Sequence, residues 1–309
     1  MISTFQPLIS KSETELLDKI SNSKKRRQSL FLLYSEFWHR AKENSDYRMT
    51  LENADYLGVD GKGVVWALNT IEHFEMKVKE DLATKPKDTF LSYCVAYIGN
   101  LFSAWNFIFL QKGTRTNSGI NLILGRNLTY SLLNLAQTKN WKILLVGGGE
   151  MNLVKNNIIK KYNNIKIDTV SFDSKSVVMI DGLNFDKLNN SNLFEVFPEL
   201  ILTTTKVLEF KPDLILVGLG GTSGKQEFLI EELTKEEEID FGLAVGIGAA
   251  LDHLGGGKKQ KEAPQWMQKV GLEFVWRIIN QPYRIKRILD SVFGLIQLVT
   301  DETLKSKKP

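Results

Sequence analysis

The sequence predicts an α/β fold in which a parallel β-sheet is flanked by helices. Three apolar runs end in glycine and lead towards a helix-like segment: residues 141–150 (WKILLVGGGE), 211–221 (KPDLILVGLGG) and 241–257 (FGLAVGIGAALDHLGGG). Continuous apolar runs are typical of strands that are buried on both faces of a parallel sheet. Strand–glycine–helix alternation at this spacing favours the same arrangement. We therefore expect a Rossmann-like sheet whose ligand lies at the carboxyl ends of the strands, where these glycines are.

Two further strands are predicted earlier in the chain. Residues 29–41 (SLFLLYSEFWHRA) are typical of a strand that runs into a helix. Residues 54–68 (ADYLGVDGKGVVWAL) indicate a short strand, a turn at Asp60-Gly61 and another helix. A carboxylate at the end of a strand faces the predicted ligand site, where it can act as a general base or bind a sugar hydroxyl. The alternative is a turn aspartate that caps the following helix through its own backbone.

Helices are predicted between and after these strands. Residues 121–138 precede the first glycine-ended strand, and the polar segment 151–162 follows it. Residues 192–210 have a helix-like pattern, and a helical tail over 268–301 is rich in Arg, Lys, Trp, Phe and Ile. Pro282 in this tail should start a new helix, because proline fits the first turn of a helix and not its interior.

Residues 89–111 (TFLSYCVAYIGNLFSAWNFIFLQ) carry no charge. This length is sufficient to span a bilayer. Its Asn, Ser and Gly residues make it a poor span, however. Besides a span, two interpretations are open: a helix that is buried or covered by a partner, and a segment that lies against a membrane.

Composition narrows the class of protein. The chain has 309 residues, a net charge of +4 and a pI of about 8.9, which is compatible with anionic phosphates or lipid and is too weak to indicate nucleic acid. One cysteine, Cys94, excludes an internal disulfide, and three histidines make a His-rich metal centre unexpected. This cysteine usage favours a reducing, cytoplasmic location. The N-terminus lacks the basic and apolar regions of a signal peptide.

The glycine-rich loops could hold a phosphate. In 146–149 (VGGG), backbone N–H groups at a helix start could bind one, although a glycine turn for close packing is the alternative. The stretch 218–227 (GLGGTSGKQE) resembles a P-loop at first sight. However, Leu219 stands at the required first glycine, and Gln226 stands at the Ser/Thr that holds Mg²⁺. An NTPase loop is therefore not expected.

The residues after this loop carry useful chemistry. Lys225 can meet a phosphate as a point charge, and the amide of Gln226 can donate to and accept from a sugar or a uracil-like edge. The alternative is a solvated helix start. In the tail, Arg277, Arg284 and Arg287 would share one side of a continuous helix. Guanidinium groups suit a diphosphate, but a basic face on lipid or water is equally possible.

Four stretches together resemble the WecG/TagA/CpsF family of glycosyltransferases. They are NADYLGVDGKGVVWAL, RTNSGINL, PDLILVGLG with KQE, and VGIGAALDHLGG with APQWMQKVGLEFVWRIINQPYRIKRIL. The matching regions, 47–67 and 115–289, cover most of the chain. The last stretch is long and specific, so a chance match is not expected.

The resemblance implies transfer of an N-acetylmannosamine-type sugar in the synthesis of bacterial surface polysaccharides, including cell-wall teichoic acid. The implied donor is a UDP-sugar and the implied acceptor an undecaprenyl-diphosphate-linked sugar. The reaction would be inverting and need neither cofactor nor metal. The protein would be peripheral at the inner face of the cell membrane, touch the membrane through its tail and bind no nucleic acid; an oligomer is possible.

The family pattern also implies a set of site residues. Asp60 matches the proposed base that deprotonates the acceptor hydroxyl. The implied substrate-binding residues are Arg115, Asn121, Gly148, Gly218, Gly220, Lys225, Gln226, Asp252, Arg277, Arg284 and Arg287. We expect the arginines of the tail to close over the site and to meet the diphosphate.

The resemblance divides the chain into three parts and marks where it departs from the family. We expect a lead-in over 1–28, a glycosyltransferase domain over 29–267 and a basic helical appendage over 268–309. Within the domain, 68–114 is much longer than the family's connector. The loop before Lys225 is also longer, and Asn121 replaces an aspartate. These departures motivate a second hypothesis, a non-catalytic membrane-associated protein that binds a nucleotide sugar. A third, an NAD enzyme, rests only on VGGGE.

Overall fold

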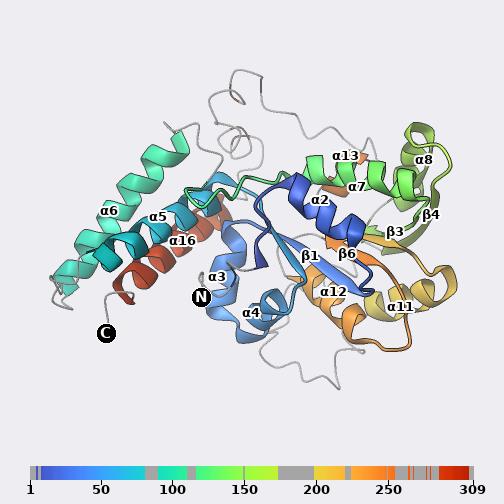
Figure 1. Cartoon of the computed structure of the whole chain (residues 1–309), viewed down its shortest axis with the longest axis horizontal. Helices are drawn as coiled ribbons and strands as arrows, with labels where there is room; N and C mark the ends of the chain where they lie inside the picture. Colours follow the sequence, from blue (N-terminus) through green and yellow to red (C-terminus); the bar gives the residue numbers. More distant parts are fainter. Residues whose placement is uncertain are drawn as a thin grey trace.

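The computed structural model describes residues 5, 8–80, 90–109, 116–148, 150–172, 198–219, 224–248, 250–254 and 285–305, and the single positions 264, 267, 276 and 279. Six parallel strands form one sheet in the order β2-β1-β6-β5-β3-β4 (Figure 1). The strands are β1 (Gln28–Leu33), β2 (Tyr56–Val59), β3 (Lys142–Gly148), β4 (Lys166–Phe172), β5 (Leu214–Gly218) and β6 (Leu243–Gly246). The predicted α/β fold with a Rossmann-like parallel sheet is confirmed.

Helices connect the strands and cover both faces of the sheet (Figure 1). They are α2 (Glu13–Asn22), α3 (Ser35–Glu43), α4 (Ser45–Glu52), α5 (Lys62–Glu80), α6 (Phe90–Phe109), α7 (Gly125–Lys139), α8 (Met151–Lys161), α11 (Pro198–Phe210), α12 (Lys225–Lys235), α13 (Ala250–Leu254) and α16 (Ile285–Lys305). All three glycine-ended strands and both earlier strand–helix units lie where the sequence predicts them.

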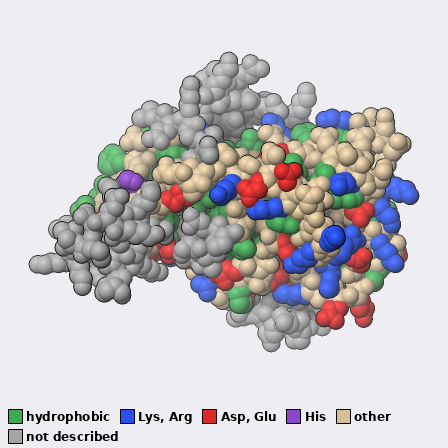
Figure 2. All heavy atoms as spheres, in the orientation of Figure 1, with side chains coloured by type: hydrophobic (Ala, Val, Ile, Leu, Met, Phe, Trp, Pro, Cys, Tyr) green, Lys and Arg blue, Asp and Glu red, His purple; other side chains and the backbone are tan. Residues whose placement is uncertain are grey.

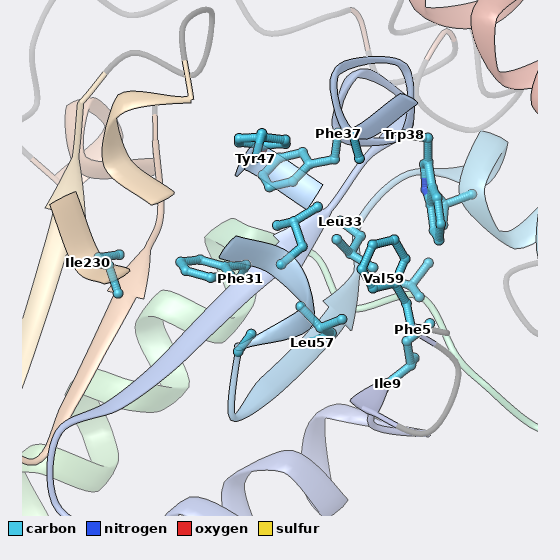
Figure 3. Packing of buried hydrophobic residues seen from close by; sticks show 14 of the residues in the cluster. Phe5, Ile9, Phe31, Leu33, Phe37, Trp38, Tyr47, Leu57, Val59 and Ile230 are labelled. Carbon is cyan, nitrogen blue, oxygen red and sulfur yellow. The ribbon is translucent and has the colours of Figure 1, made fainter. Parts of the chain in front are cut away.

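Alternation along the strands builds a core on each side of the sheet. Phe31 and Leu33 of β1 belong to one apolar cluster, and Leu30 and Leu32 to the other. The first cluster lies under α3, α4, α5, α11, α12 and α16, and the second under α2, α7, α8 and α13. Figure 3 shows Phe31 and Leu33 on the same side as Phe37 and Trp38 of α3. Both faces are therefore dry over the central strands, which explains why β3, β5 and β6 are apolar runs, whereas Lys166 and Ser171 of the edge strand β4 are exposed.

The helix predicted over 121–138 begins later, at Gly125. The preceding residues are extended because the edge of the sheet holds them: Asn121 donates its backbone N–H to the Lys11 carbonyl at 2.7 Å, and Ile123 donates to the Val59 carbonyl at 2.7 Å. Within the predicted lead-in lies α2, whose Leu16 and Ile20 are buried.

Beyond the carboxyl ends of β1 and β2, helices α5, α6 and α16 form a separate layer (Figure 1). Helix α16 packs against α3, α5 and α6, and buries Leu295, Ile296, Leu298 and Val299. The charge-free segment forms α6 in this layer. Among the described helices, none is both long enough and apolar enough to cross a bilayer.

Two glycines should respond in opposite ways to substitution by alanine. A Cβ at Gly242 would lie 2.2 Å from the Asp213 carbonyl oxygen, which already accepts a hydrogen bond from Leu243 N at 2.9 Å. We expect Gly242→Ala to push β5 from β6 and to destabilise the protein by about 1–3 kcal/mol or more. A Cβ at Gly99, inside α6, meets nothing within 4 Å. Gly99→Ala should stabilise by about 0.5–1 kcal/mol.

Urea unfolding of the two variants measures both effects under the same conditions. Shifts of the midpoint in the same direction for the two variants would contradict the described packing at one of these glycines.

Candidate active site

The carboxyl ends of neighbouring strands meet at one edge of the sheet. Five strands end side by side, because the last or next-to-last residues of neighbouring strands are paired. The pairs are Leu33–Val59, Val217–Gly246 and Gly147–Gly218. The segments that follow these strands start α3, α5, α8, α12 and α13. Residues far apart in the sequence are therefore brought to one edge, which is where a parallel α/β sheet binds its ligands.

Asp60 lies at this edge, directly after β2. Its backbone N–H donates to the Leu33 carbonyl at 2.7 Å, which continues the pairing of β2 with β1. Gly61 has a φ of +107°, so the chain turns sharply and α5 begins at Lys62. The Asp60 carboxylate accepts from the backbone N–H of Gly125, the first residue of α7, through Oδ2 at 3.4 Å. This contact orients the partly exposed carboxylate towards the N-terminal end of a helix.

The start of α12 is buried. Gly224 precedes it with a φ of +73°, and Lys225, Gln226 and Glu227 are 1%, 4% and 1% exposed. The alternative of a solvated helix start is therefore wrong for all three residues. The sequence favoured it because Lys, Gln and Glu are mostly exposed in proteins.

The amide of Gln226 is held on both sides. Its Oε1 accepts from Gly248 N at 3.1 Å, and its Nε2 donates to Glu227 Oε1 at 2.5 Å. A Cβ at Gly246 would lie 2.9 Å from Nε2, so the end of β6 allows this approach only because residue 246 is glycine. Gln226 is thereby fixed against the end of β6.

Glu227 sits beside a partly buried arginine, Arg40, and a buried tyrosine, Tyr47. Burial raises the pKa of Glu227 to about 7, although the hydrogen bond from Gln226 and the positive charge of Arg40 act in the opposite direction. Its Oε2 has no hydrogen-bond partner among the described residues. Burial lowers the pKa of Arg40, but Tyr47, Glu227 and Glu36 together raise it above the ordinary value. Arg40 Nη2 lies 3.1 Å from Glu36 Oε1, and its guanidinium lies 5.0 Å from the centre of the Tyr47 ring.

This cluster reaches the loop that precedes α12. A Cβ at Gly224 would lie 2.8 Å from Tyr47 Cε2 and 3.1 Å from Arg40 Nη1. Burial, with the Glu227 carboxylate next, raises the pKa of Tyr47 well above its ordinary value. Arg40 and Tyr47 were not predicted as part of the site. Their local signal is only the Glu36–Arg40 spacing of an i,i+4 pair, which does not point to residue 227.

The glycines at the strand ends have different roles. A Cβ at Gly147 or Gly218 would come within 2.8 Å or 2.7 Å of the Leu251 side chain. Packing against α13 therefore requires glycine at both positions. Gly148 has space, because the nearest atom to a Cβ there is the Phe172 carbonyl oxygen at 4.0 Å. Packing does not explain the glycine at 148, so the phosphate-binding role predicted for it stays open.

The remaining predicted residues are distributed as follows. Asn121 Nδ2 donates to the carbonyls of Lys11 and Gly119 at 3.0 and 3.1 Å, so its amide supports the loop before α7. Asp252 and Arg287 lie in α13 and α16, but their side chains are not described. The other predictions that fall outside the described residues are Arg115, Gly220, Arg277 and Arg284. Among the described residues, no group of three or more His, Cys, Asp or Glu is placed to hold a metal ion.

One known relative shares a long aligned region with this chain. The N-acetylglucosaminyldiphosphoundecaprenol N-acetyl-beta-D-mannosaminyltransferase of Bacillus subtilis (strain 168) is 27% identical over 188 residues. The aligned region covers 60% of this chain and 62% of that protein, so it spans less than two thirds of the relative's length.

The sequence model of the Glycosyl transferase WecG/TagA/CpsF family matches residues 114–309. This region begins after Asp60 and α6, and it contains β3 to β6 with the buried start of α12. The match covers well over half of the chain and includes the strand ends that carry Gln226. On this basis, the chain belongs to the glycosyl transferase WecG/TagA/CpsF family.

Proposed function

We propose that the protein transfers an N-acetylmannosamine-type sugar from a UDP-sugar to an undecaprenyl-diphosphate-linked sugar in the synthesis of a bacterial surface polysaccharide. The observation that carries this proposal is the position of Asp60 and Gln226 on one edge of the sheet, in a chain of this family. The relative from Bacillus subtilis has a name that specifies such an acceptor and such a sugar. The inner face of the cell membrane is the corresponding place of action.

The sheet sets the distance between Asp60 and Gln226. Asp60 follows β2, and Gln226 is anchored to the segment after β6, two strands away in the order β2-β1-β6. Neighbouring strands are about 4.8 Å apart, so the two strand ends are separated by about 10 Å. A donor sugar bound near β6 and an acceptor hydroxyl bound near β2 can bridge this separation.

Asp60 is the base in this proposal. One carboxylate oxygen accepts from Gly125 N, which orients the group for proton transfer. As the acceptor hydroxyl attacks the anomeric carbon, its proton passes to Asp60, the bond from the sugar to UDP breaks and the configuration inverts. The UDP leaves with its negative charge, which Arg277, Arg284 and Arg287 of the tail would stabilise.

Glu227 acts as a positioning residue in the same proposal. It accepts the hydrogen bond from Gln226 Nε2 at 2.5 Å, while Gly248 N–H is bound to the other end of the amide. These two contacts decide which end of Gln226 is the donor and which is the acceptor. A defined amide orientation is needed if Gln226 is to recognise one edge of the nucleotide or sugar.

One observation favours the second candidate, a non-catalytic protein that binds a nucleotide sugar at the membrane. Lys225 and Gln226, both expected to meet the donor, are 1% and 4% exposed, and the Gln226 amide is engaged within the protein. Binding of UDP without sugar transfer would support this candidate.

Substitution of the base tests the enzyme. Asp60→Asn should lower kcat about 10²–10⁴-fold, because the amide cannot take the proton, while UDP should still raise the melting temperature as in the wild type. The assay follows radiolabelled sugar from a panel of UDP-sugars to a lipid-diphosphate acceptor. Asp240→Asn, a surface aspartate paired with Arg26, is the matched control and should keep full activity. Unchanged turnover of Asp60→Asn would remove Asp60 from the base role, and no transfer from any donor would reject the enzyme.

The raised pKa of Glu227 makes stability depend on pH. Its ordinary pKa is 4.5 and its pKa in the fold is about 7, so between these values the folded chain binds more protons than the unfolded chain. The Glu227 contribution to stability therefore falls as pH rises through this window and is constant above it. In Glu227→Gln this contribution is absent. As pH is raised from about 4.5 to about 8, the free energy of unfolding of the variant should therefore rise relative to that of the wild type by on the order of 2–3 kcal/mol.

Urea unfolding at a series of pH values measures this difference. Glu232→Gln is the control, because this partly exposed residue lies on the same helix and pairs with Lys235 at 2.7 Å. A difference between Glu227→Gln and the wild type that does not change with pH would show that the pKa of Glu227 is the same in the folded and the unfolded chain.

A further inference from the structure

Helix α6 turns an apolar face outward. Its large exposed side chains are 37–66% accessible: Val95, Ile98, Leu101, Phe102 and Trp105, which we call the α6 outer face. Val95, Ile98, Phe102 and Trp105 follow one another at intervals of three, four and three residues, so they form one stripe along the helix. A helix on the surface of a soluble protein normally presents polar or charged residues there. The whole of α6 contains no charged residue.

Directional contacts fix this orientation. On the inner side, Ser103 Oγ accepts from Trp66 Nε1 of α5 at 3.1 Å, and Asn100 Nδ2 donates to Thr300 Oγ1 of α16 at 3.0 Å. Ala104 and Phe107 are buried against the core. A rotation that buried Phe102 would break both hydrogen bonds. Asn100 and Ser103 are thus engaged by the neighbouring helices, whereas the large apolar side chains of the α6 outer face point outward, beside the exposed Asn106.

The α6 outer face lies close to the candidate base. Helix α5 begins at Lys62, two residues after Asp60, and Trp66 in its second turn contacts Ser103 of α6. Six residues of rise are about 9 Å, and neighbouring helix axes are about 10 Å apart. The middle of α6 is thus within a few helix diameters of Asp60. In Figure 1, α6 is at the opposite end of the molecule from β4 and α8.

We propose that the α6 outer face docks on the lipid bilayer that contains the acceptor. This inference rests on the proposed function, since that function places the acceptor's polyprenyl chain in a bilayer. An uncharged helix with an exposed Phe and Trp suits the boundary between headgroups and acyl chains, where such aromatic side chains are favoured.

The area of the face favours lipid over a second copy of the chain. Large apolar side chains have about 150–250 Å² each, so at these exposures the five together present on the order of 500 Å². Each partner in a stable protein interface of standard size buries about 800 Å². A bilayer needs no such matching surface. On the face in Figure 2, Lys and Arg side chains gather over the sheet end, and described hydrophobic side chains appear towards the α6 end.

Flotation with vesicles of phosphatidylcholine, and with phosphatidylcholine containing phosphatidylglycerol, tests the proposal on the full-length chain. The wild type should bind both, and binding should persist when NaCl is raised from about 0.1 to about 0.5 M, because an apolar contact is not screened. The double variant Phe102→Asp with Trp105→Asp should bind at least about tenfold more weakly. Leu153→Asp with Ile159→Asp on α8 is the matched control; both residues are 42% exposed, and this variant should bind as the wild type does.

Transfer assays separate this proposal from the proposed function. With a water-soluble, short-chain lipid-diphosphate acceptor, the Phe102/Trp105 variant should be as active as the wild type. With undecaprenyl acceptor in vesicles, it should be at least about tenfold less active. If the wild type transfers sugar to neither acceptor, the proposed function fails, while flotation still decides the role of α6.

Three results would overturn the proposal. The first is a failure of the vesicle experiment: either the wild-type protein does not bind vesicles, or the double variant binds them as the wild type does while its circular dichroism spectrum shows that it is folded. The second is binding that occurs only with anionic vesicles and is abolished by salt. Such binding would assign the contact to the basic tail. The third is a dimer that the double variant dissociates without any effect on flotation, which would make the face a contact between copies.

Discussion

Parallel pairing of the strands is the constraint on which the candidate site depends. Since every strand of the sheet points the same way, residues 60, 148, 226 and 248 reach a single edge although they span much of the chain. The pairing is kept dry by apolar clusters on both faces, so its hydrogen bonds do not compete with water. Polar chemistry is confined to the edge, where the strands end and their glycines allow close approach. Asp60 and Gln226 are thus placed by the register of β2 with β1 and of β5 with β6.

At that edge, the start of α12 carries an unusual amount of buried charge. Glu227, Arg40 and Glu36 lie together with Tyr47, beside Gly224, the residue that precedes α12. Buried ion pairs are seldom retained for stability alone, because desolvation offsets most of their attraction. Here the cluster has a visible geometric consequence: Glu227 holds Gln226 Nε2, and Gln226 in turn binds the backbone of the segment after β6. The burial of the Glu227 carboxylate, which costs desolvation energy, is therefore also what orients the Gln226 amide.

The sheet could be predicted from the sequence, because β3, β5 and β6 are apolar runs that end in glycine, and β1 and β2 are apolar runs that lead into helices. The position of Asp60 at a strand end followed from the same pattern. The burial of Glu227 could not be predicted, since it lies beside Arg40 and Tyr47, which are more than 170 residues away and give no local signal. The late start of α7 has a similar cause: Lys11 and Val59, distant in sequence, hold Asn121 and Ile123 extended. Tertiary hydrogen bonds overrode a helical pattern in this segment.

The layer of α5, α6 and α16 links the part of the chain that matches the family to the part that does not. Helix α16 lies within the matched region, whereas α6 lies in the long connector before it. Thr300 of α16 binds Asn100 of α6, and Val299 beside it is fully buried. Removal of residues 268–309 would therefore take away the support of α6 as well as the basic tail, and any loss of membrane binding would have two explanations. Point substitutions on the α6 outer face leave α16 in place, so only they can assign the contact to one helix.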